Sequence, residues 1–206
     1  MVDIFTIFSE LSYLGVFLML FLVNVPPILM PPTWLILASF YLLDDSLNPF
    51  ELALVGGCGA TAGRFVLLRS SMFFKKYVRG ERKTSLDKVT EYLSTKKFGY
   101  LLITFLFSIS PLPSNVLFVG YGLMGAKNLQ IYIGFWAGRV LAYFAMISIS
   151  KVVLMPFTDL FEDRLSGIII IDVLSIGSLV FFTSIKWDVL LKEKKLRFVR
   201  PKLWRI

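Results

Sequence analysis

Apolar residues form six long stretches along this chain, and most polar residues gather between them. The stretches cover residues 4–25, 33–43, 50–68, 98–124, 129–150 and 166–185. A helix needs about 20 apolar residues to cross the hydrocarbon core of a bilayer. The stretch 33–43 would extend only about 16 Å as a helix, so it cannot cross alone. The pattern predicts an all-α polytopic membrane protein in which some apolar segments do not span.

Prolines interrupt two of the longer apolar regions. The first cluster comprises Pro26, Pro27, Pro31 and Pro32, and the second comprises Pro111 and Pro113. Proline has no N–H and clashes with the preceding turn, so closely spaced prolines end a helix. We therefore expect residues 4–43 and 98–125 to form re-entrant hairpins that enter and leave on one side. Residues 50–69, 129–150 and 166–185 are then the spans.

The two halves of the chain share one order of features. Each proline cluster is followed by a turn containing Asn and then by an apolar segment containing Ala-Gly-Arg. The corresponding pairs are Pro31 and Pro111, 80 residues apart, Asn48 and Asn128, also 80 apart, and Arg64 and Arg139, 75 apart. Broken apolar segments in corresponding halves are typical of inverted-repeat transporters, which bind substrate near the bilayer midplane. The predicted fold is an inverted repeat of hairpin plus span, with an additional C-terminal span.

Charge predicts the orientation of these segments. The chain carries a net charge of +8, and 17 of its 22 Lys and Arg lie within 69–97 and 186–205. Basic segments beside spans favour the cytoplasmic side. Two hairpins and three spans place both segments on one side, whereas six spans would separate them. We expect a single membrane domain (1–185) in the cell membrane, with a basic cytoplasmic loop (70–97) and tail (186–206).

The basic segments leave two roles open, because positive charge can set topology or attract anionic headgroups directly. Short amphipathic helices are expected on the membrane surfaces at 85–97 and 151–165. The tail mixes aromatic and basic residues, which is typical of an interfacial anchor.

Composition excludes several kinds of chemistry. The chain has no His and a single cysteine, Cys58, which excludes histidine acid–base catalysis, internal disulfides and thiolate metal clusters. It has no P-loop, no His-Glu-x-x-His motif and no carboxylate cluster. We therefore expect no enzyme activity, no metal and no cofactor. Basic charge alone does not indicate nucleic-acid binding here, because topology already accounts for it.

Away from their ends, the predicted spans contain three charged residues: Arg64, Arg139 and Asp172. Charges at membrane depth are costly and are candidates for function. Because the Arg fork binds phosphate through two hydrogen bonds, one hypothesis is a lipid phosphate held between both Arg residues and the hairpin tips. The alternative is a structural ion pair with Asp172. Arg64 could also extend its side chain toward the cytoplasm.

Three polar residues, Thr33, Ser114 and Asn115, directly follow the prolines. They could bind a headgroup beside the positive ends of the hairpin helices. Alternatively, they only cap the second helix of each hairpin, as Ser, Thr and Asn often do.

Several motifs in this order resemble one known family. They are Ser-Tyr-Leu-Gly-Val-Phe-Leu from residue 12, the first proline-broken hairpin, Leu-Asn-Pro at 47–49, Gly-Ala-Thr-Ala-Gly-Arg-Phe at 59–65, and the Pro-x-Pro hairpin followed by Ala-Gly. Over about residues 10–150 the chain resembles a divergent member of the DedA superfamily, also called the VTT or SNARE-associated domain. The resemblance implies two re-entrant hairpins and movement of lipids between leaflets, by a flippase or scramblase. The cargo would be a polyprenyl-phosphate carrier or a phospholipid.

The chain departs from the family pattern at charged positions. Many bacterial members have an acidic residue where Thr33 stands, and Arg where Ser108 and Ser114 stand. They often have Asp where this chain has Arg64. The resemblance ties those charges to proton coupling and phosphate binding. It therefore implies an uncoupled scramblase, or a protein whose phosphate-binding charges are Arg64 and Arg139.

The expected function is lipid translocation, with anionic or phosphate-bearing membrane lipids as partners. A proton- or ion-coupled small-solute transporter and a non-transporting membrane scaffold are the alternatives. A homo-oligomer is left open.

Overall fold

The computed structural model describes residues 12–27, 32–44, 46–110 and 113–158, together with single helical positions between 166 and 181. The chain divides into two compact units, Met1–Pro156 and Phe157–Ile206. Within the second unit, the predicted span 166–185 is described at eight positions, all helical, including Val173 and Phe181. Asp172 and the tail 186–206 lie outside the described residues.

The described chain folds into helices joined by short turns and contains no strand. The elements are α2 (Ser12–Asn24), α3 (Thr33–Leu43), α4 (Pro49–Phe73), the 3₁₀ helix η1 (Lys75–Tyr77), α5 (Glu81–Thr95), α6 (Gly99–Ile109), α7 (Ser114–Met124) and α8 (Leu129–Thr158). The predicted all-α class is confirmed for this part of the chain.

Two of these segments are long and apolar enough to cross a membrane, Pro49–Tyr77 with 29 residues and Leu129–Val153 with 25. The apolar helices α2, α3, α6 and α7 have only 11 to 13 residues each. At 1.5 Å per residue they reach roughly half to two thirds of the way through a hydrocarbon core of about 30 Å.

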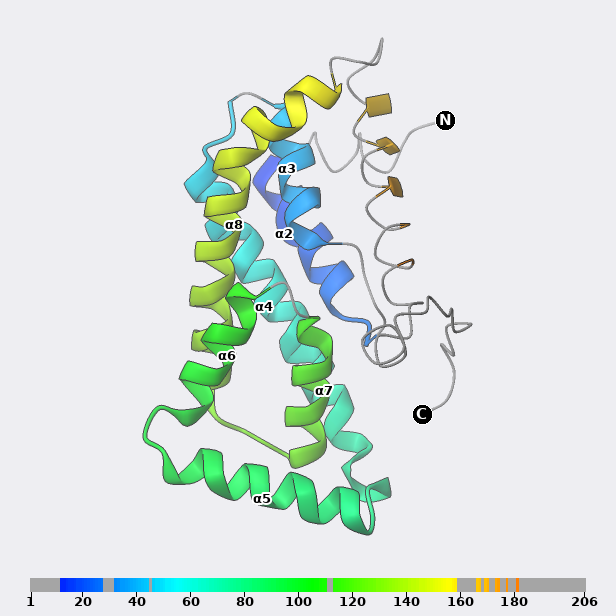
Figure 1. Cartoon of the computed structure of the whole chain (residues 1–206), viewed down its shortest axis with the longest axis vertical. Coiled ribbons are helices and arrows are strands. Elements are labelled where there is room, and N and C mark those ends of the chain that lie inside the picture. Colours follow the sequence, from blue (N-terminus) through cyan, green and yellow to red (C-terminus); the bar gives the residue numbers. More distant parts are fainter. Residues whose placement is uncertain are drawn as a thin grey trace, which may run out of the picture. The chain divides into compact units, whose positions relative to one another are not determined.

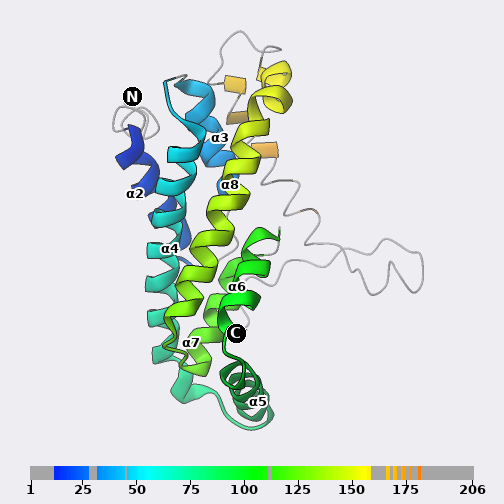
Figure 2. The ribbon, with the colours of Figure 1, turned by 90° about the vertical axis from the view of Figure 1, so that its left-hand side faces the viewer.

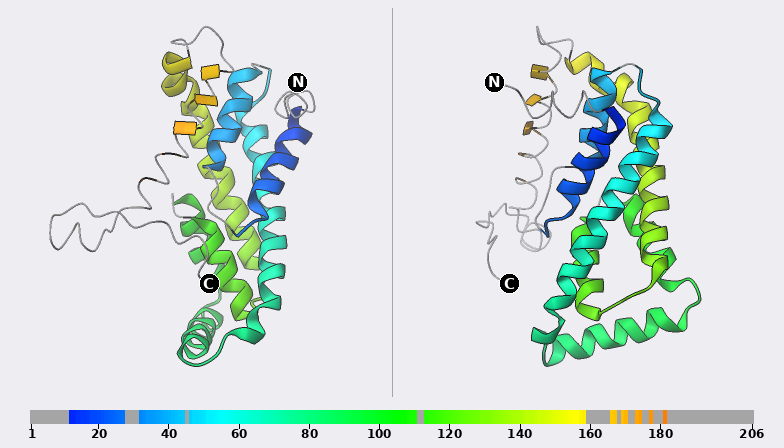
Figure 3. Two further views of the ribbon diagram at one scale, coloured as in Figure 1. Left: turned by 90° about the vertical axis from the view of Figure 1, so that its right-hand side faces the viewer. Right: turned by 180° about the vertical axis from the view of Figure 1, so that it is seen from behind.

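The short helices form two pairs that approach the middle of α4 and α8 from opposite ends. Figure 1 shows α2 and α3 beside one half of α4, with α7 beside its other half and α6 beside α8. The views in Figure 2 and Figure 3 show the same separation of the two pairs. The chain leaves the helix after Asn24 and re-enters it at Thr33, and it does so again between Ile109 and Ser114. Helix breaks therefore occur at both predicted proline clusters.

The prolines act at the ends of these helices. Pro26 and Pro27 lie in the bend after α2, while Pro32 and Pro113 are the N-terminal cap residues of α3 and α7. Pro31 and Pro111 lie outside the described residues.

Glycines let the long helices pack directly on backbone atoms of the short ones. A Cβ at Gly63 in α4 would lie 2.5 Å from the carbonyl oxygen of Phe21 in α2. A Cβ at Gly134 in α8 would lie 2.5 Å from the carbonyl oxygen of Leu101 in α6. The same holds four residues away in each long helix. A Cβ at Gly59 in α4 would approach a backbone carbonyl of α2, and a Cβ at Gly138 in α8 would approach one of α6. Small residues at this spacing permit close helix approach, so each long helix fixes the first helix of one pair.

Both long helices begin in the same way. The side chain of Asn48 accepts a hydrogen bond from the backbone N–H of Phe50, and that of Asn128 accepts one from Gln130, each at 2.9 Å. These contacts satisfy N–H groups that have no partner within the first turn. The two Asn residues of the repeated pattern are therefore helix caps.

The structure corrects two predicted boundaries. The first surface helix was expected at 85–97, but α5 covers Glu81–Thr95 and packs through Leu93, which is buried. A separate amphipathic helix was expected at 151–165, but residues 151–158 continue α8. The reason is that neither Gly nor Pro occurs between Gly138 and Pro156, so nothing breaks the helix after Ser150. Residues 159–165 lie outside the described chain.

Candidate functional site

The two helix breaks contact each other within the first unit. The side-chain amide of Asn115, at the start of α7, donates a hydrogen bond of 3.0 Å to the carbonyl oxygen of Pro27 in the turn after α2. These residues are 88 positions apart in the sequence. The contact joins the tips of the two helix pairs and places their polar residues beside α4 and α8.

Arg139 reaches one of these tips from α8. Its Nη2 donates a hydrogen bond of 3.2 Å to Oγ of Ser114. The guanidinium also lies over two rings of its own helix, 5.3 Å from the centroid of Phe135 and 5.8 Å from that of Tyr143. Contacts of this kind stabilise a cation away from bulk water and restrict its orientation.

Tyr143 connects the same face of α8 to the other tip. Its hydroxyl shares a hydrogen bond of 2.6 Å with Oγ1 of Thr33, the first residue of α3. The Tyr143 side chain is buried. Arg139 and Tyr143 are four residues apart and so lie on one face of the helix. One face of α8 therefore contacts both α3 and α7, the second helices of the two pairs.

Arg64 approaches the first tip from α4. Its side chain is only 6% exposed, and Nη1 donates a hydrogen bond of 3.2 Å to the carbonyl oxygen of Asn24. Asn24 is the last residue of α2, where unpaired carbonyls give the helix end a partial negative charge. This inward position argues against extension of the Arg64 side chain toward a membrane surface.

Arg64 and Arg139 each hold one tip through a hydrogen bond, to Asn24 and to Ser114 respectively. Within residues 12–27, 32–44, 46–110 and 113–158, neither forms an ion pair, and the Nε atoms of both Arg64 and Arg139 are buried with no hydrogen-bond partner. Buried charges without a counterion are strongly unfavourable. The described residues thus leave a concentration of positive charge and unused donors that an anion would complement.

Helix capping was the alternative role for the polar residues after the prolines. The cap positions are instead occupied by Pro32 and Pro113, and neither α3 nor α7 has a side-chain cap hydrogen bond. Thr33 and Ser114 use their hydroxyls to contact Tyr143 and Arg139. The capping interpretation is therefore wrong for these two residues.

Of the predicted site residues, the structure brings together Arg64, Arg139, Thr33, Ser114 and Asn115 around the two tips. Asp172, the predicted ion-pair partner, lies outside the described residues. Ser108, one of the departures from the family pattern, is buried at the α6–α8 contact, where its Oγ donates to the carbonyl oxygen of Phe105 at 2.9 Å.

Two residues of the site were not predicted from the sequence. Tyr143 could have been found from its position one helical turn after Arg139. Asn24 could have been found as the polar residue that ends the first apolar stretch. Tyr143 was missed because it lies outside the Ala-Gly-Arg and proline motifs, whereas Asn24 begins the first proline motif but was not considered as a binding residue.

Comparisons with family models, with curated proteins and with solved structures find no match to this chain.

Proposed function

We propose that this chain is a polytopic membrane protein that moves a phosphate-bearing lipid between the two leaflets of a bilayer. In this proposal α4 and α8 span the membrane, and the pairs α2–α3 and α6–α7 are re-entrant hairpins in an inverted repeat. Three features support the arrangement: the two long apolar helices, the approach of the short pairs from opposite ends, and the matching glycine contacts. The resemblance to the DedA superfamily points the same way.

One observation carries the functional proposal. Arg64 and Arg139 contact the two tips through Asn24 and Ser114. Their Nε atoms have no hydrogen-bond partner among the described residues. Charged side chains at membrane depth are costly and commonly mark a substrate pathway. A lipid phosphate is the anion that a bilayer supplies, and the guanidinium fork matches its oxygens.

The geometry suggests how a headgroup would be accommodated. The phosphate would accept hydrogen bonds from the two guanidinium groups, while Ser114 and Thr33 stay tied to α8. The acyl or prenyl tails would remain in the surrounding hydrocarbon. No carboxylate contacts Arg64 or Arg139 in the described part of the chain, which favours movement down a concentration gradient over proton-coupled export.

Orientation follows from charge in this proposal. The segment containing η1 and α5 would face the cytoplasm, since it holds most of the basic residues in the described part of the chain. The tips would then lie near the midplane of the cell membrane, where non-helical backbone persists only if it is buried or lines a polar cavity.

The proposal is tested with Arg64→Gln and Arg139→Gln in full-length protein reconstituted into liposomes. Glutamine keeps much of the side-chain length but removes the charge. A charged hydrogen bond contributes about 1.5–3 kcal/mol, so each variant should slow translocation of a labelled phosphate-bearing lipid roughly tenfold or more.

The matched control is Lys127→Gln, which removes one exposed positive charge from the turn before α8. It should transport at the normal rate. Circular dichroism and gel filtration check that all three variants fold. Normal transport by folded Arg64→Gln and Arg139→Gln would refute the phosphate role of these residues.

A further inference from the structure

A second positively charged surface lies far from the tips, at the end of the first unit where α4 finishes. We call it the α5 platform and define it as residues 69–98, which comprise the end of α4, η1, α5 and the loop into α6. Residues 69–97 contain nine Lys or Arg and only three Asp or Glu. This is the most basic segment of the described chain.

The α5 platform is attached firmly to the helices above it. Figure 1 and Figure 3 show α5 running crosswise beneath the ends of α4, α6 and α7. Leu93 is buried and Leu86 packs against the core cluster. Nζ of Lys75 in η1 donates a hydrogen bond of 2.9 Å to the carbonyl oxygen of Met124, the last residue of α7. The surface therefore has a fixed position relative to the second helix pair.

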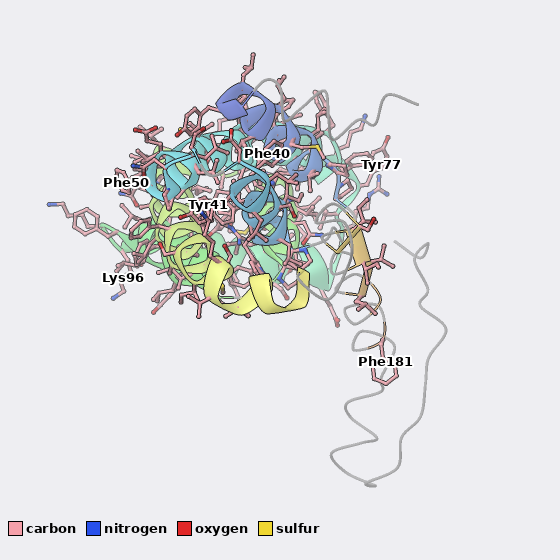
Figure 4. All side chains as sticks on the ribbon, turned by 90° about the horizontal axis from the view of Figure 1, so that it is seen from above. Phe40, Tyr41, Phe50, Tyr77, Lys96 and Phe181 are labelled. Atoms are coloured by element: carbon pink, nitrogen blue, oxygen red, sulfur yellow. The ribbon has the colours of Figure 1, made fainter. Side chains whose placement is uncertain are left out.

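Aromatic side chains are interleaved with these charges and are exposed. They are Phe73, Phe74, Tyr77, Tyr92 and Phe98, all at least half exposed. Two of them pair with neighbouring cations: Nζ of Lys76 lies 5.1 Å from the ring centroid of Tyr77, and Nζ of Lys97 lies 5.5 Å from that of Phe98. Figure 4 shows the side chains of Tyr77 and Lys96 pointing outward from the helices.

This combination fits one kind of partner better than others. Aromatic residues are enriched where a protein meets the headgroup region, and clusters of Lys and Arg beside a span attract anionic lipids. The platform lies at the end of a helix long enough to cross a bilayer, so α5 would lie along the membrane plane. A nucleic acid or an acidic protein would use the charge but would not need exposed Phe73 and Phe74 beside the end of α4.

We propose that the α5 platform binds anionic phospholipid headgroups of the leaflet it faces, separately from the site at the hairpin tips. Its lysines and arginines would contact the phosphates while the aromatic rings enter the headgroup region. The proposal rests on the membrane placement given above, but not on lipid translocation. It assigns the basic segment a role in lipid selection in addition to setting topology.

The test measures which lipid lies beside the platform. A fluorophore is attached to full-length protein at Ser70→Cys, an exposed position in the last turn of α4, with Cys58→Ser in the same chain. Quenching by brominated phosphatidylglycerol is compared with quenching by brominated phosphatidylcholine in mixed vesicles. The matched position is Ser46→Cys, exposed at the opposite end of α4.

Phosphatidylglycerol should quench the label at residue 70 about threefold more effectively than phosphatidylcholine does, with no preference at residue 46. Replacing the exposed cations Lys76, Arg79, Lys83 and Lys88 together by Gln should remove that preference. Lys75 is left intact because it holds α7. Equal quenching by both lipids at residue 70, or a preference that survives the fourfold substitution, would overturn the proposal.

The outcome does not depend on transport. Quenching by phosphatidylcholine at both positions reports that the protein is in the membrane, whatever its activity. If the labelled variants are unstable, the lipids retained by the unlabelled protein after detergent extraction are counted by native mass spectrometry. Equal retention of the two lipids would then refute the proposal.

Discussion

The packing of α2 on α4 depends on the absence of a side chain at Gly63. An alanine Cβ there would lie 2.5 Å from the carbonyl oxygen of Phe21 and 2.8 Å from Cβ of Asn24. Because the first contact is with backbone, rotation of a side chain cannot relieve it. We expect Gly63→Ala to push α2 away from α4 and to stretch the hydrogen bond between Arg64 and Asn24.

The change in the free energy of unfolding caused by Gly63→Ala has two opposing contributions. Overpacking typically destabilises a protein by about 1–3 kcal/mol. Replacing Gly by Ala in a helix stabilises it by up to about 1 kcal/mol. Gly120→Ala in α7 isolates the second contribution, since a Cβ there meets no atom within 4 Å. The difference between the two variants therefore measures the overpacking.

The assay is thermal unfolding of the purified protein in detergent. For a chain of this length, 1 kcal/mol corresponds to roughly 2–4 °C, so Gly63→Ala should melt roughly 2–12 °C below Gly120→Ala. Under the proposed function, lipid translocation should also fall, because Asn24 and Arg64 would separate. Equal melting temperatures for the two variants would refute the close packing of α2 on α4.

Three further changes test other parts of the structure. Gly134→Ala should lower the melting temperature as Gly63→Ala does, because its Cβ would lie 2.5 Å from the carbonyl oxygen of Leu101; a gain in stability would contradict the contact between α8 and α6. Tyr143→Phe should destabilise the fold by about 0.5–1.5 kcal/mol through loss of the hydrogen bond to Thr33, and a double-mutant cycle with Thr33→Val should give a coupling energy above zero. Asn48→Ala should lower the free energy of unfolding by about 0.5–2 kcal/mol through loss of the cap of α4. An unchanged midpoint of chemical denaturation would show that the cap contributes nothing to stability.

Much of the local structure could be predicted because it depends on short-range chemistry. Proline ends helices wherever the neighbouring residues lie, so the interruptions near Pro27 and Pro113 followed from sequence alone. The length of an apolar run excluded 33–43 as a span, whereas in 98–124 the prolines, and not the length, indicated two short helices. The end of α8 was misjudged because a change of polarity at Lys151 does not by itself stop a helix. Nζ of Lys151 lies 4.3 Å from the ring centroid of Tyr41, so the charge is accommodated without a break.

The site could be predicted only in part. Arg64 and Arg139 are recognisable because charge is rare in apolar segments. Their hydrogen-bond partners depend on tertiary contacts between residues far apart in the chain, as in the bond from Arg64 to Asn24. The repeated spacing indicates that the two tips share one site, but it does not identify which atoms bond to each other. Capping was the simpler expectation for Thr33 and Ser114, but each lies one residue inside its helix and bonds to α8 instead.

The central claim is that the two tips, with buried Arg64 and half-buried Arg139, provide a path for a lipid headgroup. The most direct measurement is translocation by the unmodified protein in liposomes, with labelled phospholipid and labelled polyprenyl phosphate, in the presence and absence of a pH gradient. We predict movement of a phosphate-bearing lipid without a gradient, faster than in protein-free vesicles. If neither lipid moves under either condition, the claim is contradicted.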